Sequence, residues 1–302
     1  MESAVVGFVG LGRMGGRMAR RVIGRGFVVH AFDVLPGTLE PLVVAGARAC
    51  SSPAEVAEKS DVVITVLPSG ASVEAAVLGE GGIASSIRPG SVLMEMSTIA
   101  PSLSRRLSVE IQDRGAEYLD CPMSGGIPGA EKGNLTVMVG GKSEVLDNCR
   151  PVLEPMAKNI FHMGEVGAGL TTKLINQLLT MTQTVLTVEA LAIGARAGVE
   201  LSTLYDVVSK SSGGSWCWEN RIPRILKGEA GAWVTIDICQ KDLALATQLA
   251  EELGIPQFVS TGAFQVLQMA KSMGMGGEDV AVLGDMYDRM LGTHMRPSEE
   301  QR

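Results

Sequence analysis

The stretch that decides the fold is Val5-Val6-Gly7-Phe8-Val9-Gly10-Leu11-Gly12-Arg13-Met14-Gly15. An apolar run at 4–9 leads into three glycines spaced G-x-G-x-x-G, and a helical pattern follows over 13–24. The motif alone is a weak signal, but between a strand and a helix it predicts a loop that binds a dinucleotide. Gly10 permits the tight turn, Gly12 lets a pyrophosphate approach the backbone, and Gly15 lets the helix pack closely on the strand.

An aspartate at the end of the next apolar run supports this interpretation. Asp33 follows the run at 28–32. A carboxylate at this point can bind the 2′-hydroxyl of a ribose and repels a 2′-phosphate. No arginine follows in Val34-Leu35-Pro36, so the sequence favours NAD over NADP. The alternatives are a plain strand-to-helix turn for the glycines and an ordinary turn aspartate for Asp33.

The first half of the chain alternates short apolar runs with helical patterns. Strand patterns lie at 4–9, 28–32, 61–67, 91–96, 116–120, 134–139 and 159–162. Helical patterns lie between them, near 13–24, 53–59, 71–78, 101–114 and 143–157. This alternation predicts a parallel sheet with helices on both faces, and the continuous apolar runs suit strands buried on both sides. The first half is therefore predicted to be an α/β domain of the Rossmann dinucleotide-binding kind.

After about residue 164 every pattern is helical. The helical stretches are 168–197, 202–210, 215–227, 237–253, 257–273 and 279–292. We predict an NAD-binding domain over 1–164 and an all-helical substrate and dimerisation domain over 165–302, joined by the long helix. The apolar stretch 178–197 fits either a core helix or a membrane span, and its polar residues Gln183, Glu189 and Arg196 favour a core helix.

Composition narrows the class of protein. The 302 residues carry a net charge of −7, which does not suit a general nucleic-acid binder. The five scattered cysteines form no CxxC pair and predict free thiols in a reducing compartment. No basic-then-apolar leader is visible at the amino terminus, so we expect a cytoplasmic protein. The three histidines show no ligand spacing, so no metal site is predicted.

A polar face on the long helix is the candidate catalytic feature. Lys173, Asn176 and Gln177 lie three and four residues apart, and this spacing places them on one helical face. Because the surrounding sequence is apolar, the lysine is expected to lose solvent. Burial lowers the pKa of a lysine, so that it can donate and accept a proton near neutral pH. The alternative is a lysine at a helix start that reaches back to water.

With three later motifs, the glycine loop resembles the β-hydroxyacid dehydrogenase family, the relatives of 3-hydroxyisobutyrate dehydrogenase, within the 6-phosphogluconate dehydrogenase-like group. The matching segments are Gly10–Ala19, Asp120–Gly126, Gly164–Gln177 and Lys241–Leu243. The resemblance implies an NAD-dependent oxidoreductase that interconverts a β-hydroxy acid and its semialdehyde or keto acid. It also implies an active site between the two domains, and a homodimer or homotetramer.

The resemblance assigns roles to the residues of these motifs. Lys173 resembles the general acid/base of the family. Asn176 and Gln177 would orient the substrate, with Gln177 standing where the family has a second asparagine. The substrate-binding residues implied are Ser124, Gly125, Gly126 and Asp242. Gln keeps the amide but adds a methylene, so the pocket is expected to be reshaped. The serine loop also departs from the family at Cys121 and Met123, which replace Ala and Val.

Further positions resemble the cofactor contacts of the family. They are Leu11, Arg13 and Met14 in the glycine loop, Leu67 and Pro68 beside the adenosine, Ser72 in the same region, Thr98 at the nicotinamide, and Lys241. Without the resemblance these residues are explained by a strand end, a turn proline, a helix cap and a solvated charge pair.

The substrate is the least determined point. The segment 211–221 is expected to line the site, and its Arg221 either meets a second carboxylate or lies on the surface. Segments 30–33 and 272–279 are similar to 2-(hydroxymethyl)glutarate dehydrogenases. Reduction of tartronate, succinic or methylmalonate semialdehyde remains open. Two other interpretations are an imine reductase and a non-catalytic NAD-binding module, but both usually lack the lysine.

Overall fold

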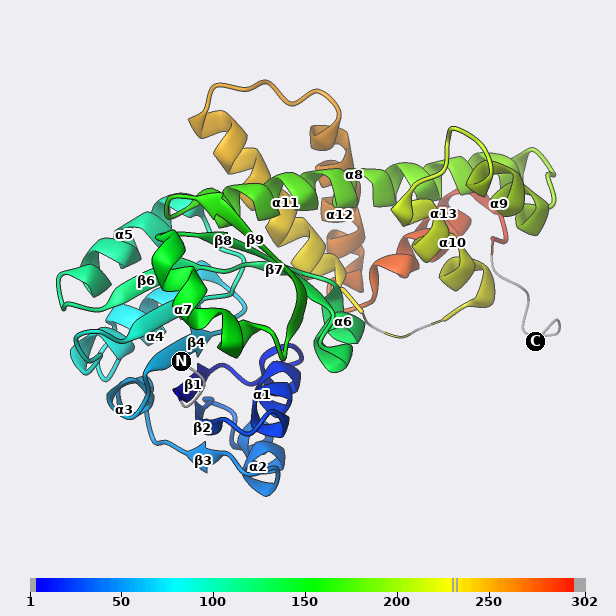
Figure 1. Cartoon of the computed structure of the whole chain (residues 1–302). Helices are drawn as coiled ribbons and strands as arrows, with labels where there is room; N and C mark the ends of the chain where they lie inside the picture. The colour runs from blue at the N-terminus through cyan, green and yellow to red at the C-terminus, as the bar shows by residue number, and fades with distance from the viewer. Residues whose placement is uncertain (1–3, 230, 232, 296–302) are drawn as a thin grey trace. The chain divides into compact units, whose positions relative to one another are not determined.

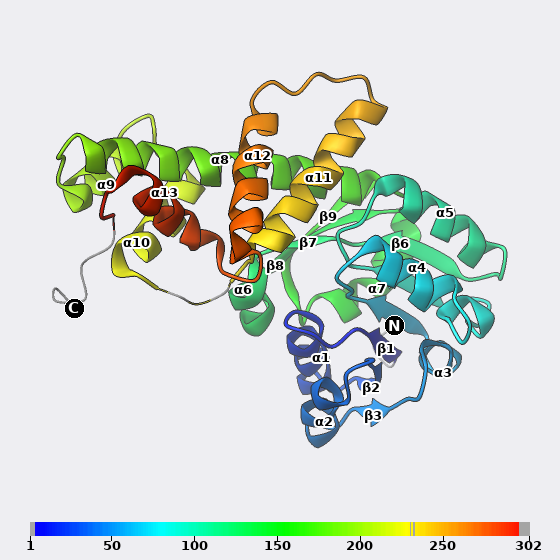
Figure 2. The same ribbon diagram turned by 180° about the vertical axis from the view of Figure 1, so that it is seen from behind.

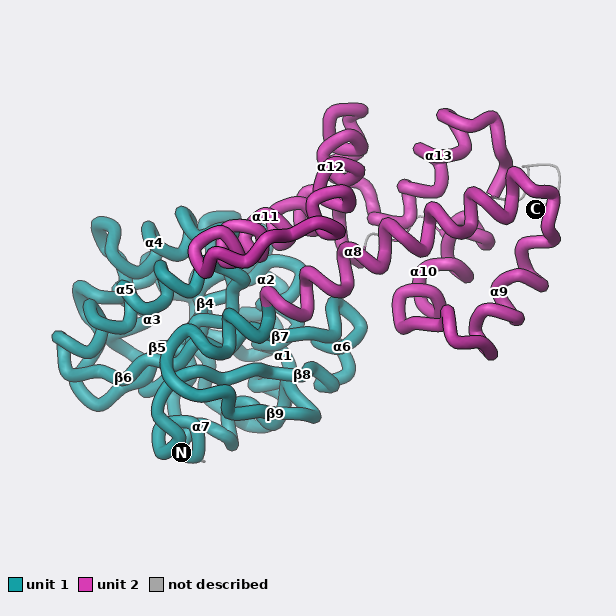
Figure 3. Tube along the Cα trace, turned by 90° about the horizontal axis from the view of Figure 1, so that it is seen from above, with its two compact units in different colours: residues 1–173 teal, residues 174–302 magenta. Residues whose placement is uncertain are grey.

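The computed structural model describes residues 4–229, 231 and 233–295. Two compact units divide the chain, residues 1–173 and residues 174–302 (Figure 3). Each unit has its own hydrophobic core and is described by itself.

One sheet organises the first unit (Figure 1). Its strands are β1 Val5–Val9, β2 Val28–Phe32, β3 Arg48–Ala49, β4 Val62–Thr65, β5 Val92–Glu95, β6 Glu117–Asp120, β7 Met123–Ser124, β8 Leu135–Gly140 and β9 Ala157–Gly164. The spatial order is β3-β2-β1-β4-β5-β6-β8-β7, and β9 pairs with β8. The strands from β3 to β6 are parallel, in the order typical of a dinucleotide-binding sheet.

The far edge of the sheet differs from the all-parallel prediction. Strand β8 runs antiparallel to β6 and β7, and parallel to β9. Mixed sheets of this kind are common when an antiparallel strand joins a parallel sheet. The short β7 was not expected, because its two residues give no periodic pattern.

Helices cover both faces of this sheet. They are α1 Gly15–Gly24, α2 Pro36–Val44, α3 Pro53–Glu58, α4 Gly70–Leu78, α5 Pro101–Gln112, α6 Gly126–Lys132 and α7 Ser143–Leu153, with the 3-10 turn η1 Ile83–Ser85. Alternate strand residues feed two cores. Phe8 and Met94 pack with α1, α6 and α7, whereas Val63 and Leu93 pack with α3, α4 and α5. The predicted α/β fold is confirmed, although α2 was missed.

The second unit is helical, as predicted. It contains α8 Ala168–Arg196 from residue 174 onward, α9 Leu201–Ser209, α10 Trp216–Lys227, α11 Ile236–Glu252, α12 Ser260–Ala270, the π-helical turn η2 Lys271–Met275, the 3-10 turn η3 Val280–Val282 and α13 Leu283–Leu291. Helices α11 and α12 lie side by side (Figure 2), and Gln240 of α11 bonds to Gln268 of α12 at 3.1 Å.

Helix α8 has one buried apolar face and one exposed apolar face. Met181, Val185 and Val188 belong to the core of the second unit. By length and composition alone this helix is long and apolar enough to cross a membrane. A core helix passes the same test, and the buried face identifies α8 as part of the helical core, as the sequence predicted.

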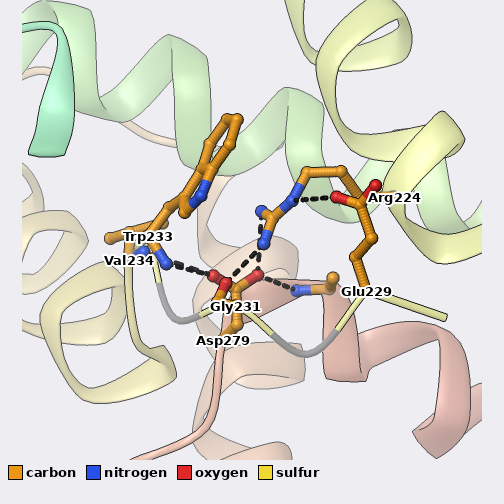
Figure 4. Close-up of polar contacts among 7 residues, drawn as sticks. Arg224, Glu229, Gly231, Trp233, Val234 and Asp279 are labelled. Atoms are coloured by element: carbon orange, nitrogen blue, oxygen red, sulfur yellow. Dashed lines mark hydrogen bonds and ion pairs between the residues drawn. The ribbon is translucent and has the colours of Figure 1, made fainter. Parts of the chain in front are cut away.

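A buried ion pair holds the segment between α10 and α11 (Figure 4). Arg224 Nη1 lies 3.1 Å from Asp279 Oδ1, and its guanidinium lies 4.3 Å from the centre of the Trp233 ring. Asp279 Oδ2 accepts the backbone N–H of Trp233 at 2.6 Å, and Oδ1 accepts that of Ala281 at 3.0 Å. The carboxylate is thus balanced by both a cation and backbone donors, which is what burial of a charge requires.

Candidate active site

The glycine loop has the geometry that a pyrophosphate requires. Gly10 has a φ of +92°, and a Cβ there would lie 2.4 Å from the carbonyl oxygen of Val66. A Cβ on Gly15 would lie 2.0 Å from the carbonyl oxygen of Gly10. Above Gly12, in contrast, no described atom lies within 4 Å of the Cβ position. The first and third glycines are needed for packing, and the second leaves open space at the start of α1, where backbone N–H groups can bind phosphate.

Asp33 is joined to the glycine loop. Its Oδ2 accepts the backbone N–H of Leu11 at 2.6 Å, and its Oδ1 accepts that of Leu35 at 2.8 Å. The side chain is only half-buried, so the remaining lone pairs can accept a hydroxyl. Arg13 is exposed and Met14 is half-buried beside it. The structure therefore brings together the glycines and Asp33, as a site for the ribose and pyrophosphate of a dinucleotide needs.

Leu67 follows the end of β4 and lies next to the glycine loop. A Cβ on Gly10 would contact Leu67 Cδ2 at 2.8 Å, which shows how close the two segments lie. The backbone N–H of Leu67 donates to Ser97 Oγ at 2.8 Å. Because Thr98 follows Ser97 directly, two predicted cofactor segments are tied to each other by one hydrogen bond. Pro68 is exposed beside Leu67.

Ser72 has a structural role that the sequence also allowed. Ser69 caps α4 by accepting the N–H of Ser72 at 3.1 Å, and the two hydroxyl oxygens lie 2.9 Å apart. Ser72 is half-buried in the first turn of α4. Its hydroxyl completes a helix cap, and a cofactor contact of this residue stays a prediction.

The serine loop lies between β7 and α6. Ser124 ends β7 and is half-buried. Gly125 has a φ of +128° and Gly126 a φ of +59°, conformations in which a side chain would be strained. Both glycines are exposed, so their backbone can be approached from solvent. This arrangement of a hydroxyl followed by two bare glycines suits a small anion.

Lys173 is buried, with 7% of its surface exposed, which is the condition that the sequence predicted. It lies in the second turn of α8. Asn176 is half-buried one turn further and donates to Gln177 Oε1 at 3.2 Å. A lysine that reaches back to bulk water would keep more of its surface exposed, so burial removes that alternative.

Gln177 meets Asp242 in the second unit. Gln177 Nε2 donates to Asp242 Oδ2 at 2.5 Å, and Asp242 Oδ1 forms an ion pair with Lys241 Nζ at 2.9 Å. The Asp242 side chain is buried and that of Lys241 is about one third exposed. The alternative of a solvated charge pair is therefore wrong for Asp242. Gln177 differs from the family asparagine by one methylene. Its amide group is held in place by the Asp242 carboxylate.

Two buried carboxylates are not among the predicted site residues. Glu95 and Asp120 are fully buried at the carboxyl ends of β5 and β6. The pKa of Glu95 is raised to about 7, mainly by burial and in part by the nearby Asp120, while hydrogen bonds from Ser97 and Thr65 oppose the change. Burial also raises the pKa of Asp120, against the backbone N–H groups of Gly167 and Leu170. A signal was present, because each residue is a carboxylate that ends a strand directly after two apolar residues.

The cysteines and Arg221 are further candidate groups, and all of them are buried. All five cysteines are free and buried, and burial raises the pKa of the Cys149 thiol to about 12. Arg221 is 5% exposed, so the alternative of a surface arginine is wrong; burial lowers the pKa of its guanidinium. The guanidinium lies 5.4 Å from the Trp216 ring. Over the described ranges, no three side chains of His, Cys, Asp or Glu gather as a metal site.

Two family models together match most of the chain. The NAD binding domain of 6-phosphogluconate dehydrogenase matches residues 5–164. A model described as the NAD-binding part of NADP-dependent 3-hydroxyisobutyrate dehydrogenase matches residues 167–287. The two descriptions name both nicotinamide dinucleotides, so the comparison supports NAD(P) binding without separating the two cofactors.

Individual relatives agree with these models over almost their whole length. The 2-(hydroxymethyl)glutarate dehydrogenase of Eubacterium barkeri is 35% identical over 97% of this chain and 98% of its own. The L-threonate dehydrogenase of Cupriavidus necator is 37% identical over 91% of this chain and 93% of its own. A crystal structure of 3-hydroxyisobutyrate dehydrogenase from Salmonella typhimurium superimposes with a TM-score of 0.84 at 32% identity, covering 93% and 99% of the two chains.

Proposed function

Because the chain belongs to the β-hydroxyacid dehydrogenase family, which includes 3-hydroxyisobutyrate dehydrogenase, we propose that it oxidises a β-hydroxy acid with Lys173 as the general acid/base. It is an NAD(P)-dependent oxidoreductase of that family. The proposal assigns nucleotide binding to residues 1–164 and substrate binding and oligomerisation to residues 165–302. The free thiols fit a cytoplasmic enzyme.

The burial of Lys173 carries the proposal. A positioned amine that is shielded from bulk water can take a proton from a bound alcohol and return it to a carbonyl oxygen. In oxidation, Lys173 Nζ takes the proton from the substrate hydroxyl while the hydride leaves the carbinol carbon. In reduction the same nitrogen returns the proton to the carbonyl oxygen. A bound nicotinamide supplies the hydride acceptor or donor.

The other site residues bind and orient. Ser124 and the backbone of Gly125 and Gly126 hold the substrate carboxylate, as their exposure and open glycine geometry permit. Gln177, fixed by Asp242, presents its amide to the substrate in place of the family asparagine. The serine loop and the Gln177 amide would hold the acid at two points and restrict its rotation. An enzyme fixes the geometry of proton and hydride transfer in this way.

We propose NAD as the preferred cofactor, on the chemistry of Asp33. Its carboxylate is fixed by Leu11 and Leu35, so a 2′-phosphate would face a negative charge that cannot turn away. Like charges placed together cost several kcal/mol at an interface. Asp33→Asn keeps an oxygen for the Leu11 amide but removes the charge. The ratio of kcat/KM for NAD over that for NADP is expected to fall by roughly 10-fold or more. An unchanged ratio would show that other residues select the cofactor.

The experiment that tests the activity is a substrate screen. 2-(Hydroxymethyl)glutarate, 3-hydroxyisobutyrate, L-threonate, L-serine and glycerate are each offered with NAD and with NADP, and formation of reduced nicotinamide is followed by its ultraviolet absorbance. Turnover of at least one acid, lost in Lys173→Ala, is the expected result. The absence of turnover with every acid and both cofactors would favour an imine reductase or a non-catalytic NAD-binding protein.

We propose a homodimer or homotetramer that uses the exposed face of α8. Ile175, Leu179, Leu186 and Ile193 are each more than half exposed. Their spacing of four and then seven residues places them in one stripe along the helix. A stripe of large apolar side chains on a long helix is typical of contact with another helix. Leu186→Lys is expected to lower the mass measured by sedimentation, and an unchanged mass would exclude this face.

A further inference from the structure

Glu95 and Asp120 are neighbours across the sheet. They are partners in the parallel register of β5 and β6, at the edge where the candidate site lies. Their hydrogen-bond donors are backbone N–H groups and the hydroxyls of Thr65 and Ser97, and the nearby Arg105 opposes the rise that burial causes in the pKa of Asp120. Burial of two like charges side by side is unfavourable. The segments that each carboxylate holds in place show what the pair does in the fold.

Asp120 holds the start of the helix that carries Lys173. Its Oδ1 accepts the N–H of Gly167 at 2.7 Å, and its Oδ2 accepts the N–H of Leu170 at 2.8 Å. Helix α8 begins at Ala168, so both donors are among the N–H groups that a helix leaves unpaired at its start. The negative charge also lies at the positive end of the helix dipole. Asp120 therefore caps α8 from a neighbouring strand.

The packing around Asp120 leaves little freedom to this cap. A Cβ on Gly140 would lie 2.3 Å from Asp120 Oδ1. A Cβ on Gly169 would lie 2.9 Å from Asp120 Oδ2 and 2.4 Å from the carbonyl oxygen of Met138. Both glycines allow α8 to start directly against the carboxylate. Lys173 follows Gly169 by four residues, about one turn, so the position of the cap sets the position of the lysine.

Glu95 holds the loops predicted to contact the cofactor. Its Oε1 accepts the N–H of Ser97 at 2.6 Å, and the Thr65 hydroxyl donates to Oε2 at 2.5 Å. Ser97 in turn accepts the N–H of Leu67. One buried carboxylate thus fixes the segment that leads to Thr98 and, through one serine, the segment that leads to Pro68.

We propose that Asp120 and Glu95 are positioning residues for hydride transfer, Asp120 by fixing Lys173 and Glu95 by fixing the loop of Ser97 and Thr98. This inference rests on the proposed function, because it takes Lys173 as the group that moves the proton. Strand β6 also leads directly into the loop of Ser124. The two strand ends therefore connect the substrate loop, the lysine and the cofactor loops to the same rigid sheet.

The two carboxylates are expected to affect different kinetic constants. Asp120→Asn keeps one acceptor oxygen but replaces the other with an amide NH2 group. That group would point at the backbone N–H of Gly167 or Leu170, and the repulsion between the two donors would displace the first turn of α8. Because a misplacement of about 1 Å can cost on the order of 100-fold, kcat is expected to fall by roughly 10- to 100-fold. Glu95→Gln loosens the cofactor loop in the same way, so KM for NAD is expected to rise by a similar factor.

Asp61 provides a matched control. Its carboxylate also accepts a backbone N–H, that of Val5 at 2.8 Å, but it is partly exposed, pairs with Arg88 at 2.8 Å, and stands before β4, at the amino ends of the parallel strands. Asp61→Asn is expected to lower stability and to leave kcat and KM within about threefold of the unchanged enzyme. A purely structural role of the buried carboxylates would give the same pattern in all three variants.

The test measures kcat, KM for NAD and the urea midpoint for Asp120→Asn, Asp120→Glu, Glu95→Gln and Asp61→Asn, with the best acid of the substrate screen. A fall in kcat for Asp120→Asn, with partial recovery in Asp120→Glu, supports the inference. Values of kcat and KM within about threefold for both sites overturn it. If Asp120→Asn does not fold, Asp120→Glu and Glu95→Gln decide. A Lys173→Ala enzyme with normal turnover would refute the proposed function instead, which separates the two failures.

Discussion

Two buried carboxylate sites, one in each unit, show how differently a fold can hold a charge. In the second unit Asp279 has a cation, Arg224, and backbone donors around it (Figure 4). In the first unit Glu95 and Asp120 lie side by side in the sheet and accept from backbone N–H groups and hydroxyls. Both arrangements satisfy the oxygens, but of these three described carboxylates only Asp279 forms a direct ion pair, whereas Arg105 acts on Asp120 from nearby and opposes the rise in its pKa.

In our proposal this difference separates a structural site, that of Asp279, from a site that positions catalytic groups. The Arg224–Asp279 pair joins segments of one unit and holds a turn that no predicted site residue uses. The pair Glu95 and Asp120 is costly, as the raised pKa of Glu95 shows. Groups with strongly perturbed pKa values gather at functional sites because their surroundings serve chemistry rather than stability.

The largest expected loss of stability comes from removing the Arg224–Asp279 ion pair. Arg224→Met leaves Asp279 buried without its cation, and removal of one partner of a buried pair costs about 3–5 kcal/mol. Urea denaturation should show this loss, while kcat of the folded fraction changes little. The control is Arg106→Met, which removes an exposed pair with Glu74 and should cost about 0–1 kcal/mol. A larger fall in kcat for Arg224→Met than for Asp120→Asn would overturn the comparison.

The next effect is a dependence of the free energy of unfolding on pH, which is expected from Glu95 and not from Asp279. The pKa of Glu95 is raised from 4.5 to about 7, so between these values the folded protein holds a proton that the unfolded chain has lost. The free energy of unfolding should therefore fall as pH rises through this range, by up to about 3 kcal/mol from Glu95, and level off above it. The raised pKa of Asp120 acts in the same direction.

Urea midpoints at several pH values measure this slope. Glu95→Gln cannot titrate, so its free energy of unfolding should fall less than that of the unchanged protein over the same range. Equal slopes in the two proteins would mean that Glu95 is not the group that titrates.

A smaller loss of stability is expected when the close packing at the start of α8 is disturbed. A methyl group on Gly169 would meet Met138 and Asp120, so Gly169→Ala must shift the first turn of the helix and should cost about 1–3 kcal/mol. Gly262, inside α12, has no described atom within 4 Å of its Cβ position. Gly262→Ala is expected to raise stability by up to about 1 kcal/mol. Both variants are compared by thermal unfolding and by kcat, and only Gly169→Ala should lose activity.

The sequence predicted the features that depend on local spacing. The strand before Gly10 follows from a short continuous apolar run, and the helix after it and the polar face of Lys173 follow from a period of 3.6 residues. The glycine motif could be interpreted because Gly10 and Gly15 answer local steric needs that the structure shows, and Gly12 leaves open space for a ligand. The helical second unit followed from patterns of the same kind.

The parts that the sequence did not predict depend on pairing across the fold. Glu95 and Asp120 become neighbours only through strand register, and Asp120 meets Gly167 47 residues later along the chain. Gln177 and Asp242 are 65 residues apart. The antiparallel β8 and the two-residue β7 are likewise set by tertiary contacts, since so short a strand carries no period of its own.

The most direct test of the account is the turnover of Lys173→Ala on the best acid of the screen. The account predicts a fall in kcat of roughly 10²- to 10⁴-fold, the usual contribution of a general acid/base, with NAD binding close to that of the unchanged enzyme. Lys158, an exposed lysine on β9, is the control, and Lys158→Ala should turn over normally. A Lys173→Ala enzyme as active as Lys158→Ala would contradict the account.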